Sequence, residues 1–125
     1  MIQTNVIVLN VDDRPEQLYV KTRDLQSAGF AVVESSTGAD ALRRISEQRP
    51  TVVLLDGQLP DIDGDEVFRR LRRDAATAQI PCIALSANAM SNDIEAARSM
   101  GFNDYWTKPI DVAAFLSDID AFFDL

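Results

Sequence analysis

The most constraining feature of this 125-residue sequence is a regular alternation between short apolar runs and segments with helical periodicity. Residues 6–11, 52–55 and 80–85 are nearly continuous apolar runs, as expected for strands covered on both faces by helices. A weaker run covers residues 30–34, and a short one covers residues 104–107. Runs of this kind favour a buried parallel sheet over a half-exposed antiparallel one.

Helical patterns fill the intervals between these runs. Pro15 suits a first helical turn and Gly29 suits a stop, so a helix is expected between them. Gly38 is expected to break the second strand before the next helix. The later helices are expected at residues 39–48, 65–73, 92–100 and 111–123. This order predicts an α/β fold of the (βα)₅ type, a doubly wound parallel sheet with the flavodoxin-like strand order 2-1-3-4-5. A single domain over residues 1–125 is expected.

Charge and composition exclude several classes of function. The chain has 12 Lys plus Arg against 20 Asp plus Glu, a net charge of −8, which argues against a nucleic-acid binder. It has no histidine, which excludes imidazole zinc sites and Ser-His-Asp triads. The single cysteine, Cys82, lies in an apolar run and is expected to be buried. No signal peptide or membrane-spanning run is evident, so a cytoplasmic location without membrane insertion is expected.

Polar residues stand where the expected strands end. Asp12 and Asp13 follow the first strand, Asp56 ends the third, Ser86 ends the fourth and Lys108 follows the fifth. Ligands of open α/β sheets bind beyond the carboxyl ends of the strands, so these residues should meet at one edge. Three close carboxylates need a cation, and Mg²⁺ prefers such oxygen ligands. A lysine and a hydroxyl suit phosphoryl oxygens, and aspartate can attack phosphorus. The residues therefore predict a Mg²⁺-dependent phosphoryl acceptor.

These motifs resemble the receiver domain of two-component response regulators over essentially the whole chain. They are the acidic pair Asp12-Asp13, Asp56 in LLDGQLPDIDG, Ser86 in ALSANAM and Lys108-Pro109 in DYWTKPI. The resemblance implies that Asp56 accepts phosphate from the phosphohistidine of a histidine kinase or histidine phosphotransfer protein. Such a chain is a phosphoacceptor that assists its own phosphorylation and dephosphorylation, rather than a turnover enzyme.

The resemblance also implies the metal ligands. Asp13 and Asp56 would bind Mg²⁺, or Mn²⁺ in its place, together with the backbone carbonyl of Gln58. Asp12 would act mainly through water. Gln58 and Asn88 flank the expected path of an attacking water, so they would tune the rate of dephosphorylation.

A switch is implied by the same resemblance. Ser86 and Lys108 would hold the phosphoryl oxygens, and Tyr105 stands at the aromatic switch position. Movement of Ser86 and Tyr105 would remodel the face made by residues 92–100, 104–107 and 111–123. This face would meet an unidentified output protein or a second copy in a weak dimer, with a monomer expected without phosphate.

Some alternatives stay open. The chain resembles both stand-alone regulators and receivers attached to hybrid sensor kinases. A receiver-like interaction module that takes no phosphate would be expected to lack a site residue, and none is lost. A small phosphatase would need a general acid that the sequence does not offer. The arginines of residues 69–73 are expected on a solvated helix face, with contact to a phosphotransfer partner as the alternative, and Asp61 and Asp63 are expected in a turn.

Overall fold

The computed structural model describes residues 6–56, 59, 61–62, 64–86 and 104–107, with the backbone alone for Asp56, Gly64, Asp65, Ser86 and the last strand. Strands and helices alternate through the first three units, as expected. The elements are β1 (Ile7–Val11), α1 (Pro15–Ser27), β2 (Ala31–Ser35), α2 (Gly38–Gln48), β3 (Val52–Asp56), α3 (Gly64–Arg73), β4 (Cys82–Ser86) and β5 (Asp104–Thr107). The helices expected at residues 92–100 and 111–123 lie outside the described residues.

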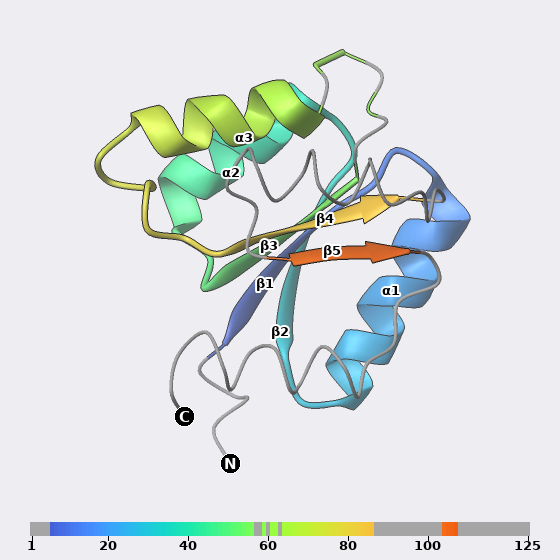
Figure 1. Cartoon of the computed structure of the whole chain (residues 1–125). Helices are drawn as coiled ribbons and strands as arrows, with labels where there is room; N and C mark the ends of the chain where they lie inside the picture. Colours follow the sequence, from blue (N-terminus) through green and yellow to red (C-terminus); the bar gives the residue numbers. More distant parts are fainter. Residues whose placement is uncertain (1–5, 57–58, 60, 63, 87–103, 108–125) are drawn as a thin grey trace.

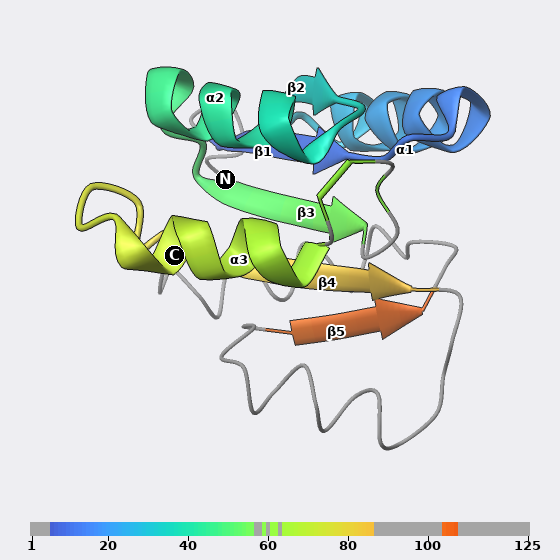
Figure 2. The same ribbon diagram turned by 90° about the horizontal axis from the view of Figure 1, so that it is seen from above.

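The strands form one parallel sheet in the order β2-β1-β3-β4-β5, which confirms the predicted doubly wound arrangement. The chain first moves outward from β1 to β2, then returns past β1 to β3 and continues in the other direction. The arrowheads of the strands therefore point toward the same edge of the sheet (Figure 2). The reversal between β1 and β3 is the place where such sheets bind ligands.

The helices cover opposite faces of this sheet. α2 and α3 lie on one face and α1 lies on the other (Figure 1). Because side chains alternate along a strand, β1 sends Leu9 and Val11 toward α2 and α3, and Val8 toward α1. The cluster under α2 and α3 contains Leu9, Val11, Ala41, Ile45, Val53, Leu55, Val67, Phe68, Leu71 and Cys82. The cluster on the α1 side contains Val6, Val8, Leu25, Phe30, Val52, Leu54, Ile83 and Leu85.

Some expected element bounds were wrong by one or two residues, and three of them are explained by a local feature. Phe30 lies after the end of α1 and not in β2, since its N–H bonds the Leu25 carbonyl of that helix at 3.1 Å. Ile80 belongs to a turn, because its N–H bonds the Thr77 carbonyl at 3.1 Å. Gly38 does not break the chain before α2 but is the first residue of that helix.

Thr37 and Gly29, at the start of α2 and after the end of α1, follow known preferences for helix ends. The Thr37 side chain caps α2 by accepting a hydrogen bond from the Asp40 N–H at 3.1 Å. Gly29 follows α1 with a φ of 99°, a conformation that favours glycine, so the predicted stop is confirmed. None of the helices among the described residues is long and apolar enough to cross a membrane.

Candidate functional site

The backbone brings the expected site positions to one edge of the sheet. Asp12 and Asp13 directly follow β1, and Asp56 and Ser86 are the last residues of β3 and β4. β1 and β3 pair in register up to Val11 and Leu55, so Asp12 and Asp56 follow paired neighbours. β3 and β4 pair in register up to Asp56 and Leu85, so Ser86 follows a paired neighbour as well. The edge at which these strands end is therefore the candidate site.

Asp12 and Asp13 have different surroundings although they are adjacent. Asp13 is exposed, whereas Asp12 is 0% exposed. One carboxylate oxygen of Asp12, Oδ1, accepts a hydrogen bond from the Arg14 N–H at 3.0 Å, which closes the turn after β1. The other oxygen, Oδ2, lies 3.0 Å from the Lys21 ammonium nitrogen. The acidic pair therefore offers one carboxylate held inside the protein and one directed to solvent.

Lys21 is a residue of this site that was not predicted. It lies on α1 beside Thr22, and its side chain is only 7% exposed. A buried ammonium group needs a paired charge, and Asp12 supplies it. The helical spacing held a usable signal, because Lys21 is three residues after Leu18 and four before Leu25, on the apolar side of the helix.

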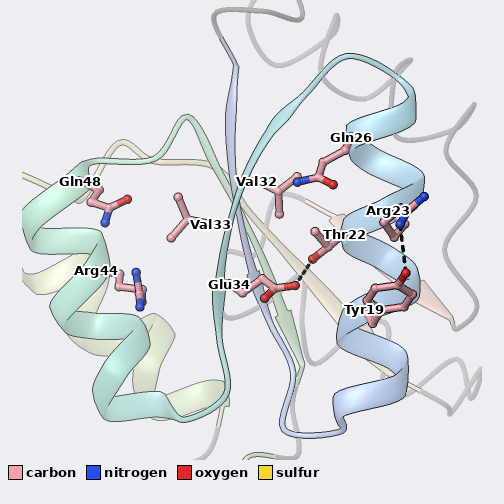
Figure 3. Close-up of a pocket in the computed structure, with 9 residues that line it drawn as sticks. All are labelled: Tyr19, Thr22, Arg23, Gln26, Val32, Val33, Glu34, Arg44 and Gln48. Carbon is pink, nitrogen blue, oxygen red and sulfur yellow. Dashed lines mark hydrogen bonds between the residues drawn. The ribbon is translucent and has the colours of Figure 1, made fainter.

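Next to the Lys21–Asp12 pair, a set of hydrogen bonds joins α1 to β1 and β2. The Asn10 amide donates to the Leu18 carbonyl at 3.2 Å and to the Thr22 hydroxyl at 3.1 Å. That hydroxyl donates to Glu34 of β2 at 2.7 Å (Figure 3). We call this set of residues the polar seam: Asn10, Asp12, Lys21, Thr22 and Glu34.

The loop after Asp56 is fixed to the neighbouring helix. The Asp61 carboxylate accepts hydrogen bonds from the N–H groups of Gly38, at 2.8 Å, and Ala39, at 3.0 Å. The hydrogen bonds from Ala39 and Gly38 lower the pKa of Asp61. A Cβ atom on Gly38 would stand 2.9 Å from Ile62 Cβ, so only glycine allows the loop this close. The expected turn residue Asp61 therefore caps α2 as well.

Several expected site residues are described only in part. The structure gives the backbone of Asp56 and Ser86 at the strand ends, and that of Tyr105 in β5, where it pairs with Ala84. Lys108, Gln58 and Asn88 lie outside the described residues. Their roles stay predictions.

The arginines of α3 follow the prediction only in part. Arg69, Arg70 and Arg73 are exposed and pair with Glu66, at 3.5, 2.9 and 3.2 Å. Arg72 is different: it donates to the Ile80 carbonyl at 2.8 Å, and its guanidinium lies 4.6 Å from the Phe68 ring centre. The arginine run is therefore a solvated face with one member bent back toward the core.

Two remaining features carry no site chemistry. Cys82 is buried as predicted, and burial raises the pKa of its thiol to about 12, which keeps it protonated. A groove of about 570 Å³ lies over β2 between α1 and α2, lined by residues that include Tyr19, Arg23 and Arg44 (Figure 3). Neither aspartate of the acidic pair lines this groove.

The fold and the site place this chain among proteins with an open parallel α/β sheet and acidic residues at or beyond the carboxyl ends of its central strands. Comparison with known families narrows this class. A model described as the response regulator receiver domain matches residues 8–120. The chain belongs to this receiver domain family. Receiver domains are phosphoacceptor signalling domains that interact with histidine kinases or phosphotransfer proteins, and they are generally not turnover enzymes.

Individual relatives agree with this assignment. The chain is 33% identical to the protein PilH of Pseudomonas aeruginosa over 114 residues, which cover 91% of this chain and 94% of PilH. It is 40% identical to the transcriptional regulatory protein KdpE of Mycobacterium tuberculosis over 92% of this chain, but only 50% of KdpE.

A solved structure of similar shape is the receiver domain of a sensor histidine kinase from Pseudomonas aeruginosa, which holds a magnesium ion in its active-site cleft. It has a TM-score of 0.86 and 32% identity, and the match covers 96% of this chain and 98% of that one. Relatives thus include a receiver attached to a kinase.

Proposed function

We propose that this chain is a phosphorelay receiver in which Asp56 accepts a phosphoryl group in a Mg²⁺-dependent reaction. The observation that carries the proposal is the convergence of Asp12, Asp13, Asp56 and Ser86 at one edge of the sheet, in a chain of the receiver family. The donor would be a phosphohistidine of another protein or domain, because the chain has no histidine.

The residues present fit a divalent cation. Asp13 is exposed, and Asp56 ends the adjacent central strand, so two acidic residues stand at this edge and their carboxylates would bind the cation. With the Gln58 carbonyl they would supply the oxygen donors that Mg²⁺ or Mn²⁺ prefers. Asp12, already held by Lys21 and the Arg14 N–H, would act through water. When bound, the cation offsets the charge of the phosphoryl oxygens and the carboxylates.

The chemical step is a transfer between two proteins. A carboxylate oxygen of Asp56 attacks the phosphorus, the P–N bond of the donor phosphohistidine breaks, and its electron pair returns to the imidazole. The Lys108 ammonium and the Ser86 hydroxyl bind the phosphoryl oxygens. Hydrolysis by water later releases phosphate and restores the Asp56 carboxylate, at a rate tuned by Gln58 and Asn88. The chain thereby assists its own phosphorylation and dephosphorylation.

The output would follow from the switch residues. Ser86 would move toward the phosphoryl group and Tyr105 would reorient, remodelling the face that includes β5. We propose that this face meets an output protein or a second copy of the chain. A cytoplasmic location and a single domain over residues 1–125 belong to the same proposal.

The test is intact-mass spectrometry after incubation with acetyl phosphate and Mg²⁺. We expect a gain of about 80 Da, the mass of one phosphoryl group, that is lost in Asp56→Ala or after removal of Mg²⁺. Asp24→Asn, which changes an exposed carboxylate on α1, is the matched control and should keep the adduct. An interaction module would show no adduct, and a phosphatase that does not use Asp56 would keep releasing phosphate in Asp56→Ala. Either result, or an adduct that survives Asp56→Ala, contradicts the proposal.

A further inference from the structure

We propose that Lys21 is a built-in counter-ion that sets how tightly the acidic edge binds a divalent cation. The inference rests on the proposed function, since it concerns the metal site of that function. Lys21 would not touch the cation but would act through Asp12, so it is a positioning residue.

The first observation is that both oxygens of Asp12 have partners within the chain. Oδ2 lies 3.0 Å from the Lys21 ammonium nitrogen, and Oδ1 accepts from the Arg14 N–H at 3.0 Å. One partner comes from α1 and the other from the turn after β1, so the carboxylate is held from two sides. A direct bond from Asp12 to a metal would have to compete with both.

The second observation is burial. The side chains of Lys21 and Asp12 are 7% and 0% exposed, so water screens their interaction far less than that of the exposed pairs on α2 and α3. A positive charge at this depth makes the potential that the carboxylates create less negative. Of the three carboxylates expected at the edge, one is neutralised by the protein before any cation arrives.

Stability alone does not account for the pair. Buried ion pairs are often no more stabilising than apolar residues of similar volume, because both charges lose their hydration. The position of Lys21 on α1 is next to Leu25 on the buried side of the helix, where an apolar residue would pack without that loss. A lysine at this position therefore adds a positive charge beside the acidic edge of the sheet, which an apolar residue would not do.

The consequence for the site is a division of roles. Lys21 holds the inward oxygen of Asp12, which leaves Asp13 and Asp56 as the carboxylates for direct metal contact and makes the net charge of the cluster one unit less negative. The affinity for Mg²⁺ is thereby weaker than three unpaired carboxylates would give, and Mg²⁺ exchanges more readily.

The experiment measures the Mg²⁺ dissociation constant by calorimetry, with folding of each variant checked by circular dichroism. Lys21→Met should tighten Mg²⁺ binding by about tenfold or more, because one positive charge leaves the cluster. Lys21→Arg keeps the charge and should stay within about threefold of the wild type. Asp12→Asn leaves Lys21 without its carboxylate charge and should weaken binding by about tenfold or more.

The decisive variant is the double substitution Asp12→Asn with Lys21→Met, which removes both charges and is testable even where Lys21→Met alone does not fold. Its dissociation constant should return to within about threefold of the wild type. Binding as weak as that of Asp12→Asn alone would overturn the inference, because Lys21 would then have no effect on the metal. If the wild type binds no Mg²⁺ at all, the metal site of the proposed function fails, and the inference fails with it.

Discussion

The two faces of the sheet are built in different ways although they share the same strands. Under α2 and α3 the core cluster contains aliphatic side chains, Phe68 and the Cys82 thiol. Under α1 an apolar cluster that includes Val8 and Leu25 is joined by the polar seam. β1 and the residue after it show the contrast, because Leu9 and Val11 enter the first cluster while Asn10, and Asp12 directly after the strand, belong to the seam.

The difference shows which face of the sheet positions a residue of the candidate site. Buried polar groups need partners to avoid a loss of stability, and hydrogen bonds of the Asn10 amide and the Thr22 hydroxyl and the Lys21–Asp12 ion pair supply many of them in the seam. The seam runs along α1 up to Asp12, at the carboxyl edge of the sheet. One face therefore supplies apolar packing, while the other also fixes a charged residue of the candidate site.

The largest expected effect is on the apolar face. Phe68→Ala should lower the free energy of unfolding by about 3–5 kcal/mol, because Phe68 is fully buried and the truncation leaves a cavity. Urea denaturation measures the loss. Tyr19→Ala is the matched control, since it removes an aromatic ring of α1 that is 59% exposed, and it should cost less than about 0.5 kcal/mol. Equal losses in the two variants would contradict the packing role assigned to this face.

A smaller effect is expected in the polar seam, from a change that leaves volume nearly constant. Thr22→Val should lower the free energy of unfolding by about 1–3 kcal/mol, because Asn10 and Glu34 both lose a buried hydrogen-bond partner. Thr22→Ser keeps the hydroxyl and should retain more of the stability. The same urea titration compares them. If Thr22→Val were as stable as the wild type, the hydrogen bonds of Thr22 would contribute nothing to the free energy of unfolding. The two faces would then differ in amino-acid composition but not in how they are stabilised.

The apolar framework was readable from the sequence because it depends on local patterns. Runs of β-branched residues located the strands, and the spacing of Val67, Phe68 and Leu71 gave the inward side of α3. The strand ends then placed Asp12 and Asp56 at one edge without any knowledge of side-chain contacts. Two strand starts were wrong where a turn or helix end took over the backbone hydrogen bond, at Phe30 and Ile80.

The contacts around the candidate site were less predictable because they join distant segments. Asp61 caps α2 from a loop more than twenty residues further along the chain, and such a cap has no local sequence signature. The position of Lys21 on α1 does not identify its partner, because the ammonium nitrogen lies 3.0 Å from Asp12 Oδ2 only once α1 packs against β1. The choice of partner is a tertiary fact, and sequence spacing gives only the side of the helix.

The smallest expected effect concerns the ion pairs outside the core, which contrast with the buried Lys21–Asp12 pair. Partial burial acts to raise the pKa of Asp40, but hydrogen bonds from Arg43, Arg44 and Ser35 outweigh it and lower the pKa to about 2. An unfolded aspartate titrates near pH ~4, so this group contributes stability above that pH and loses it as the pH falls toward 2.

Asp40→Asn should therefore lower the free energy of unfolding by about 1 kcal/mol at neutral pH, a value reduced by solvent screening around a partly exposed group. The difference between variant and wild type should shrink between pH ~4 and about 2, where Asp40 of the folded wild type also becomes protonated. Urea titrations at several pH values, repeated at high salt, measure this difference. A gap that stays constant with pH would mean that Asp40 acts through packing or the helix cap. If the difference in unfolding free energy did not change with salt, the Asp40 ion pairs would be screened no more than the buried Lys21–Asp12 pair. The exposed and the buried ion pairs would then not differ in their screening.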